Sequence, residues 1–383
     1  PPAVRAARRW RPLALVGATA ALSLASAGAA LGVLLRTDAG SAWVLSQVPG
    51  LMVEQPQGRV FGGEFSAQRV AFAAGARAVV LHRLAWRDTH WAWRPHDGAW
   101  FGLQVHGLTV QRVEVGASTD TTPAAPPRSL RLPVALLLDG LAVGRVDVDG
   151  RELASDVAAR VELGHGHGSE HRVEQLVLRT ALAQVQGRLQ IGADAPFAVD
   201  ATLAARSADG AAWPWQAQAR ARGPLAALDV QAGLTSPRSA GAQFDAQATL
   251  APFAAWPLAA LQARATDIDL AGLVQGAPQT RLSGKATVDT RAIDQPMAAR
   301  VTLANALPGP WSAQRLPLQA LDIDIAGRAD RPDRLDVQRF DLRLPGDGGR
   351  VTGQGHWHAD AARLVLALQG VRPAAADARA PAM

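Results

Sequence analysis

The strongest candidate for a catalytic or metal-binding site is a short segment in the middle of the chain. Three imidazoles and one carboxylate fall within seven residues, at His165, His167, Glu170 and His171. Histidine nitrogens and carboxylate oxygens are ligands that Zn²⁺ takes in proteins. The glycines between them instead favour a flexible hairpin loop, and nothing nearby supplies the fixed second shell that a metal site needs. We therefore predict a loop here and no metal.

Two further groupings resemble catalytic sets. His356 and His358 share one face of a predicted strand, and carboxylates at i, i+2 recur in 267–269 and 322–324. Side chains at this spacing on a strand form one face, and acidic ones normally form its solvated face. The sequence has no cysteine, phosphate-binding glycine loop, nucleophile elbow or zinc-protease helix motif. We predict no catalytic residues and no cofactor, and therefore a protein that is not an enzyme.

The elements that would carry such side chains are strands. From about Gly58 onward, short apolar runs alternate with polar residues, and Gly, Pro and Asp clusters separate them. Leu321–Ile325 alternates strictly, with three aliphatic residues on one face and two carboxylates on the other. The stretch 250–265 is rich in alanine and suits a helix, but Pro252 and Pro257 argue against a long one. The apolar strand face that we expect comprises Val146, Val148, Leu176, Leu178, Leu321, Ile323, Ile325, Leu335, Val337, Leu342 and Leu344.

One internal repeat supports an elongated sheet. Gly-Leu-Thr-Val-Gln-Arg-Val-Glu-Val at 107–115 recurs as Gly-Leu-Ala-Val-Gly-Arg-Val-Asp-Val at 140–148. Each copy reads as two short strand pieces offset by one residue, as a β-bulge would produce. Repeated strand units along a chain indicate a sheet that extends in one direction.

The N-terminal region predicts a membrane anchor. Residues 13–35 contain no charge and, as a helix of roughly 35 Å, could cross a hydrocarbon core of about 30 Å. A cleavable signal peptide is the alternative, since 25–27 and 27–29 resemble cleavage sites, but the apolar run continues past both. The anchor residues that we expect are Leu13, Leu15, Val16, Leu22, Leu24, Leu31, Val33, Leu34 and Leu35.

The basic residues give this anchor an orientation. The chain has a net charge of +6, but Arg5, Arg8, Arg9 and Arg11 all precede the apolar run. Without them, 35 basic residues face 33 acidic ones, mixed along the chain. A nucleic-acid-binding protein would concentrate its basic residues on one surface, so we predict no nucleic-acid partner. The one-sided basic flank predicts a cytoplasmic N-terminus and a periplasmic body.

These patterns divide the chain into five parts. After the anchor, Ser41 could cap a short helix that ends before Pro49. Trp86, Trp91, Trp93 and Trp100 predict either core packing or a ring at a membrane interface. The parts are a basic flank at 1–12, a transmembrane helix at 13–35, a juxtamembrane helix and linker at 36–57, an elongated β domain at 58–370, and a disordered tail at 371–383.

Several stretches resemble the amino-terminal part of the TamB family, within the AsmA-like bridge-like lipid-transfer proteins. They are the post-anchor segment 37–45, the Gly-x-hydrophobic-x-Gly strand start at 58–65, Leu-Ala-Trp at 84–86, the paired-strand pattern at 100–110, the Leu-Pro strand entry at 130–134, and 140–143. The resemblance implies a mostly β fold: an N-terminal transmembrane helix, then a curved antiparallel or mixed sheet forming a U-shaped groove. It also implies phospholipid as ligand. An outer-membrane barrel partner of the TamA type would engage a C-terminal part that this sequence does not contain.

Four functions compete at this point. The leading expectation is a bacterial inner-membrane protein that conducts phospholipid toward the outer membrane. The alternative implied by the resemblance is an assembly factor for outer-membrane β-barrels or autotransporters. An enzyme on a β-sandwich lacks a coherent catalytic set, and a β-solenoid adhesin would need stricter repeats. Alternation alone does not separate an open apolar groove from a closed sandwich, because both produce the same pattern.

Overall fold

The computed structural model describes residues 37–372 and residue 377. The gaps within that range are 49, 75–76, 95–98, 117–126, 133, 212, 238–240, 255, 275, 291–295, 329, 332 and 359–360. The predicted anchor at 13–35 lies outside the described residues. Within the described part, no helix has both the length and the apolar character needed to span a bilayer.

The chain is mostly β and divides into two compact units. The first comprises the residues up to Ala92 together with Leu103–Thr119 and Leu138–Glu152, and the second comprises the rest. The elements of the first part of the chain are α2 (Asp38–Ser46), β1 (Met52–Glu54), β2 (Gln57–Gly58), β3 (Phe65–Ala74), β4 (Arg77–Trp86), β5 (Asp88–Arg94), β6 (Ala99–His106), β7 (Thr109–Val115) and β8 (Ala135–Val148).

The helix α2 is joined to the first unit by side-chain hydrogen bonds. The hydroxyl of Thr37 accepts from the backbone N–H of Gly40 at 3.1 Å, so Thr37 caps the helix. Ser41, the cap expected from the sequence, lies inside α2 and accepts from the N–H of Val60 at 3.0 Å. Leu45 then packs with Val60 against a buried cluster that includes Phe65.

The internal repeat forms a parallel strand pair. Strands β7 and β8 align so that Val110 faces Val143 and Arg112 faces Arg145, which is the 33-residue offset of the repeat. A Cβ at Gly144 would lie 2.7 Å from the carbonyl oxygen of Gln111, so only glycine fits there. β7 also pairs antiparallel with β4, which makes the sheet mixed.

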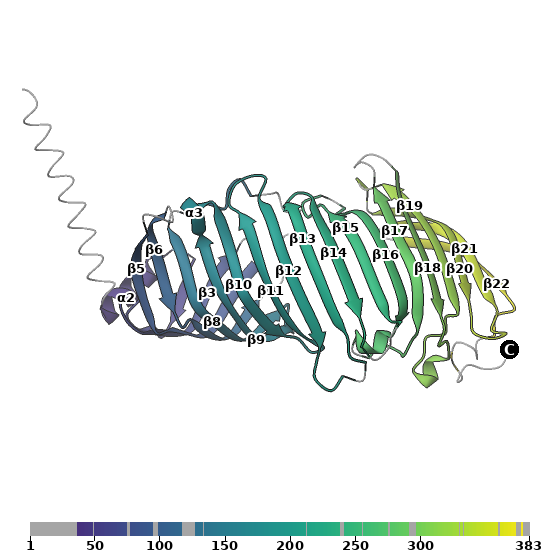
Figure 1. Cartoon of the computed structure of the whole chain (residues 1–383), viewed down its shortest axis with the longest axis horizontal. Helices are drawn as coiled ribbons and strands as arrows, with labels where there is room; N and C mark the ends of the chain where they lie inside the picture. The colour runs from purple at the N-terminus through teal and green to yellow at the C-terminus, as the bar shows by residue number, and fades with distance from the viewer. Residues whose placement is uncertain are drawn as a thin grey trace, which may run out of the picture. The chain divides into compact units, whose positions relative to one another are not determined.

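The second unit is an antiparallel meander in which each strand pairs with the next. Figure 1 shows β10 to β22 following one another side by side in chain order. Among the described strands, β22 pairs with β21 alone, so the sheet is open. The elements are β9 (Arg151–Gly164), α3 (His165–Gly168), β10 (Glu170–Arg179), β11 (Ala183–Gly192), β12 (Ala198–Ser207), β13 (Gln216–Pro224), β14 (Leu228–Thr235), β15 (Gln243–Leu250), β16 (Leu258–Ile268), η1 (Leu270–Gly272), β17 (Leu282–Thr290), β18 (Pro296–Asn305), η2 (Trp311–Ala313), β19 (Ala320–Arg328), β20 (Arg334–Arg343), β21 (Arg350–His358) and β22 (Ala361–Gln369).

Candidate functional site

Three apolar rows cross the thirteen strands β10–β22 on one face of the sheet. The central row is Leu176, Gly187, Leu203, Ala219, Ala232, Ala246, Ala263, Ala286, Val301, Ile323, Phe340, Gly353 and Leu366. The tryptophan-side row is Leu178, Val185, Ala205, Ala217, Leu234, Phe244, Ala265, Gly284, Leu303, Leu321, Leu342, Val351 and Leu368. The far row is Val173, Leu189, Ala201, Ala221, Val230, Ala248, Leu261, Val288, Ala299, Ile325, Val337, Gly355 and Leu364.

No residue of these three rows is fully buried. Most are half-buried, and Leu203 and Leu366 in the central row are 43% and 48% exposed. In a closed β-sandwich, the apolar residues in the middle of each strand interdigitate with a second sheet and lose contact with solvent. The exposure therefore rules out a closed sandwich core over these rows and leaves an apolar face that is accessible from one side.

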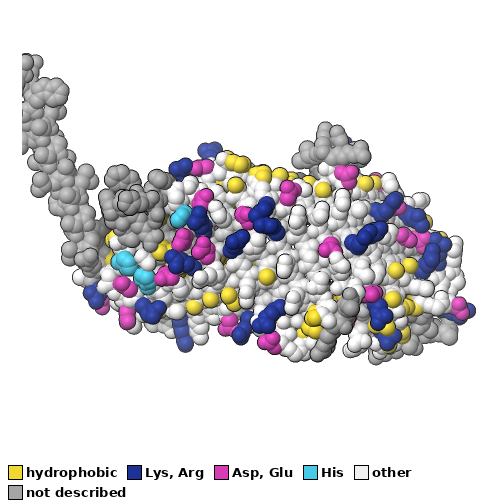
Figure 2. Space-filling view, viewed as in Figure 1, with side chains coloured by type: hydrophobic (Ala, Val, Ile, Leu, Met, Phe, Trp, Pro, Cys, Tyr) yellow, Lys and Arg dark blue, Asp and Glu magenta, His cyan; other side chains and the backbone are white. Residues whose placement is uncertain are grey.

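The opposite face of the same strands is polar. On the face seen in Figure 2, few hydrophobic side chains gather over β10–β18, and charged side chains of both signs are scattered among backbone and side chains of other types. Asp322 and Asp324 lie on this face as the alternation predicts, and Asp324 accepts a hydrogen bond from Arg300. This bond lowers the pKa of Asp324 below its usual range.

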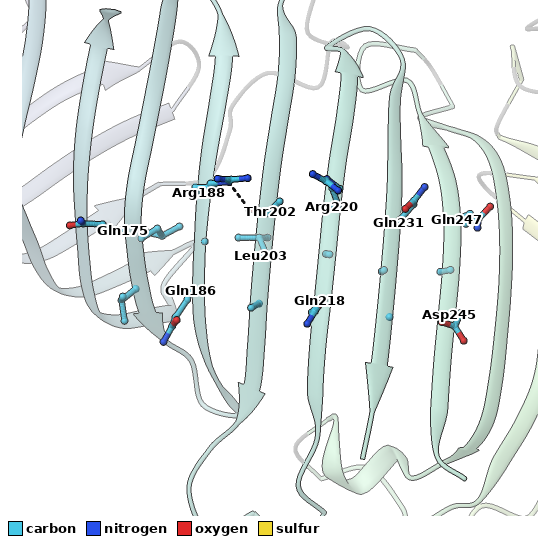
Figure 3. Close-up of a pocket in the computed structure, with 18 residues that line it drawn as sticks. Gln175, Gln186, Arg188, Thr202, Leu203, Gln218, Arg220, Gln231, Asp245 and Gln247 are labelled. Carbon is cyan, nitrogen blue, oxygen red and sulfur yellow. Dashed lines mark hydrogen bonds between the residues drawn. The ribbon is translucent and has the colours of Figure 1, made fainter. Parts of the chain in front are cut away.

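A shallow trough crosses the polar face over β10–β15 and has a volume of about 1030 Å³. Figure 3 shows its long side chains in two lines. Gln186, Gln218 and Asp245 form one line, and Arg188, Arg220 and Gln231 lie in the other. Arg188 donates to the hydroxyl of Thr202 at 3.2 Å. Among its lining residues, Asp245 is the one carboxylate, and none is a histidine, serine or cysteine. The trough therefore holds no acid–base pair or nucleophile with a base.

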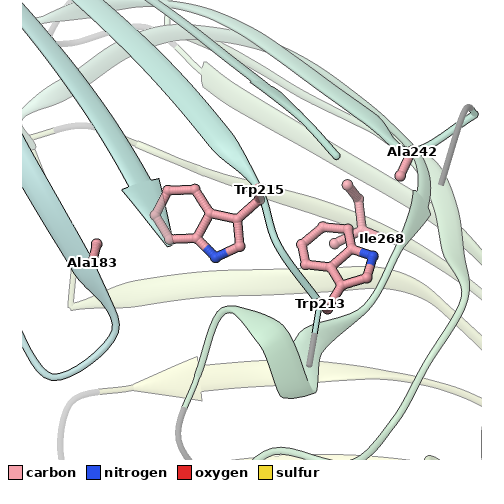
Figure 4. Packing of buried hydrophobic residues seen from close by; sticks show 5 residues of the cluster. All are labelled: Ala183, Trp213, Trp215, Ala242 and Ile268. Carbon is pink, nitrogen blue, oxygen red and sulfur yellow. The ribbon is translucent and has the colours of Figure 1, made fainter. Parts of the chain in front are cut away.

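A tryptophan rim borders one margin of the apolar face. Trp213 and Trp215 are buried with Ala183, Ala242 and Ile268, as Figure 4 shows. The indole N–H of Trp215 donates to the carbonyl of Gly272 in η1 at 2.9 Å. The partly buried residues packed against this rim are Val185, Ala205, Ala217, Leu234, Phe244, Ala265 and Leu273, six of which belong to the tryptophan-side row. The rim thus covers one margin and leaves the central and far rows accessible.

Two buried carboxylates are neutralised by arginines on the same and the neighbouring strand. Asp341 is 4% exposed and accepts from Arg350 and from Arg339. The hydrogen bond from Arg350 lowers the pKa of Asp341 to about 2, and burial opposes this shift. In the first unit, Arg145 and Arg112 donate to Asp147, which is 2% exposed. Arg145 contributes most to lowering the pKa of Asp147.

The first unit has its own apolar face, built largely from β-branched residues. Val146 and Val148, two of the predicted residues, pair with Val113 and Val115 of β7 and are half-buried. The rows that result are Phe72, Val79, Val115 and Val148, then Val70, Leu81, Val113 and Val146, and then Ala67, Leu84, Val110 and Val143.

Most of the remaining residues predicted for the apolar face lie in the three rows. Leu335 is half-buried on the same face, opposite Gly327, but Leu344 differs. It follows the end of β20, is 7% exposed, and donates its N–H to the carbonyl of Gly349 at 3.0 Å. The pair Leu342 and Leu344 alternates as a strand would, but the tight turn that begins at Pro345 places Leu344 in a buried position at the end of the sheet.

Neither a family model nor a curated protein nor a solved structure matches this chain. The functional reading therefore depends on the geometry of the sheet and on the residues themselves.

The histidine loop is used for structure. The Nδ1 of His171 accepts from the N–H of Gly164 at 3.1 Å, and its Nε2 lies 2.8 Å from the carbonyl of Leu130. Nε2 must therefore carry the proton, and neither nitrogen has a lone pair left for a metal. The side chain of His167 lies outside the described residues. In the part that the structure describes, no three His, Asp or Glu side chains are grouped as metal ligands would be.

The other candidate groupings also have local partners. The Nδ1 of His356 lies 2.8 Å from a carboxylate oxygen of Asp336, and His358 accepts from Arg334 at 3.1 Å. Asp269 is not on a strand face, because β16 ends at Ile268. Its carboxylate accepts from two backbone N–H groups and caps η1, so the alternation seen in 267–269 was misread as a continuing strand.

The tryptophans that shape the site were not the ones singled out in the sequence. Trp86 stacks on Phe65 at 4.3 Å within a buried cluster, whereas Trp91 is 52% exposed and stacks on Phe61. The side chains of Trp93 and Trp100 lie outside the described residues. The rim tryptophans could have been recognised from Trp-Pro-Trp at 213–215, directly after the Asp-Gly turn that ends the preceding strand.

Proposed function

We propose that this chain is an inner-membrane-anchored periplasmic protein whose apolar sheet face carries phospholipid acyl chains toward the outer membrane. The observation that carries the proposal is the set of three apolar rows over β10–β22, none of whose residues is buried. At about 4.8 Å between strands, thirteen strands extend the strip over roughly 58 Å measured along the sheet. At about 3.4 Å per residue, the three rows are roughly 14 Å wide.

The chemistry of the face favours hydrocarbon. The backbone groups of these strands are paired in ladders and the rows contain no polar side chain, so a ligand finds no hydrogen-bond partner on the face. Acyl chains need none, and each buried methylene contributes about 0.8 kcal/mol. Soluble surfaces rarely leave an apolar strip of this size bare, which supports an occupied face. In the proposed arrangement the sheet curves with this face inward, as a U-shaped groove.

The anchor and the partner complete the proposal. The uncharged run at 13–35 holds the N-terminus in the inner membrane, and its basic flank puts the sheet in the periplasm. The resemblance to the TamB family supports the same direction of transport, with an outer-membrane barrel partner of the TamA type at the far end.

A second candidate function has one observation in its favour. In β22, the last described strand, Val365 and Leu368 are each 66% exposed. Its outer edge carries backbone groups without a partner strand among the described residues. Such an edge can pair with an incoming strand, as an assembly factor for outer-membrane β-barrels would require.

Photo-crosslinking in cells tests the lipid conduit. A crosslinker at Ile323 or Leu178 should capture lipid, whereas the same probe at Asp322 or Asp324 should not, because successive side chains point to opposite faces. Ile323 and the two aspartates share β19, so expression and local flexibility are matched. Equal capture on both faces, or none on either, would overturn the conduit and favour the assembly factor.

A further inference from the structure

Five glycines on the apolar face of the second unit lie directly opposite a leucine of the next strand. The pairs are Gly187–Leu203, Gly284–Leu303, Gly327–Leu335, Gly353–Leu366 and Gly355–Leu364. A Cβ built on any of these glycines would lie between 2.5 and 3.0 Å from the leucine's Cδ2. Atoms do not approach so closely, so the methyl group occupies the space of the missing side chain. Each of these leucines therefore lies along the sheet, over its glycine.

The backbone of the next strand also comes close at these positions. A Cβ on Gly187 would lie 2.7 Å from the carbonyl oxygen of Thr202, and one on Gly353 would lie 2.7 Å from that of Val365. Glycine inside a strand commonly marks a bend or a close backbone approach. The crowding at these pairs lies on the side where the missing side chain would project, which is the apolar face.

The polar face provides the contrast. Gly233 lies inside β14 on that face, between Gln218 and Asp245 of the neighbouring strands. A Cβ on Gly233 would have no atom nearer than 3.8 Å, which is an ordinary contact distance. A glycine within a strand of the second unit is thus not crowded in every case, and the five close approaches to leucine lie on the apolar face.

We infer that the five glycine–leucine pairs set the depth of the apolar face and decide whether an acyl chain can pass over it. This inference rests on the proposed lipid function. A leucine that lies along the sheet raises the floor little, whereas one that stands upright projects its isobutyl group into the space above. The pairs therefore determine how much space the face leaves for a ligand. An acyl chain is the occupant that they suit, because the three rows offer a ligand no polar side chain.

The experiment fills one glycine at a time in the full-length chain in cells. Gly187 lies on β11, between β10, which carries Leu178, and β19, which carries Ile323, so photo-crosslinkers at those two residues report on either side of it. Gly187→Leu should lower lipid capture at one of the two positions several-fold. Gly233→Leu adds the same side chain on the polar face and should leave both unchanged. Circular dichroism of the purified variants checks that the sheet is intact.

A milder pair of variants covers the case in which Gly187→Leu does not fold. Gly327→Ala should lower capture at Ile323, and adding Leu335→Ala should restore it. At this pair the new Cβ meets the Cδ2 of Leu335 at 2.7 Å, whereas the nearest backbone atom, the carbonyl oxygen of Arg334, is 3.3 Å away. Unchanged capture in folded Gly187→Leu, or a loss in Gly327→Ala that Leu335→Ala does not reverse, would overturn the inference. If the unaltered chain captures lipid at neither position, the proposed function fails, and the inference falls with it.

Discussion

The two units present the same kind of apolar sheet face but treat it differently. In the first unit, Leu45 of α2 and Val60 pack against one part of the face, where Phe65, Ala67 and Val70 are only 3%, 3% and 7% exposed. In the second unit, the tryptophan rim covers one margin, and every residue of the three rows keeps some exposure. The first face is thus buried around Phe65 and half-buried toward Val146 and Val148, whereas the second is a surface that lacks a cover among the described residues.

The two units share the same strand pattern, so the role of an apolar face depends on which other segments pack against it. Leu45, Leu51, Val53 and Val60 pack against the buried cluster of the first unit and all come from the stretch before β3. Val53 does so from within the sheet, because it belongs to β1 and pairs with Val70. The longest connections of the second unit's meander, 269–281 and 306–319, contain η1 and η2, and α3 joins β9 to β10. Among the described residues, none of its connections forms a long helix. An open face can bind a ligand along its length, whereas a covered one contributes only stability.

The largest effect should come from a charge placed in each face. Phe65→Asp buries an unpaired carboxylate in the covered face and should lower the free energy of unfolding by at least about 3 kcal/mol. Ile323→Asp puts the same group on the open face, where water can reach it, and should cost less than about 2 kcal/mol. Hydrogen exchange read separately over β3 and β19 measures both. Equal loss of protection in the two variants would mean that the second face is also a closed core.

An intermediate effect should appear in acid, and in both units. Because the folded pKa of Asp341 is lowered to about 2, its ion pairs contribute stability above pH ~4. That contribution should disappear as the pH falls from about 4 to 2. Asp341→Asn should therefore lower the unfolding midpoint at neutral pH and flatten its dependence on pH in that range.

Asp147→Asn tests the same pairing of a buried carboxylate with two arginines in the first unit, where the pKa of Asp147 is also lowered. Denaturant unfolding at a series of pH values measures both variants. An unaltered acid profile in Asp341→Asn would show that this carboxylate is not held by its arginines in solution.

The smallest effect should follow from changes on the polar face. Arg300 is 69% exposed and pairs with Asp324, and exposed pairs of this kind contribute little to stability. Arg300→Ala should leave the unfolding midpoint and the lipid capture at Ile323 unchanged within error. A clear loss of capture would mean that the polar face also takes part in binding, and would weaken the contrast between the two faces.

Much of the strand content was readable because alternation has a direct physical cause. Leu321–Ile325 forms part of β19 with its aliphatic residues on one face, as its pattern predicts. The alanine-rich stretch at 250–265 was harder, since alanine favours helices when isolated. It contributes to β15 and β16, where pairing with strands on both sides outweighs that preference. Ser41 was wrongly predicted as a helix cap because its hydroxyl accepts from Val60, which is distant in sequence. Asp269 was wrongly placed on a strand because β16 ends just before it and its carboxylate caps η1.

The sequence alone determined that this protein is built of strands with one apolar and one polar face, because consecutive side chains on a strand must point in opposite directions. It also determined where the repeat lies. Only the tertiary structure decided the register that aligns the apolar residues of thirteen strands into three rows. It alone decided that Leu344 is buried, that the Trp-Pro-Trp segment at 213–215 forms a rim, and that leucines lie over glycines. These features depend on contacts between neighbouring strands and loops, which no local pattern encodes.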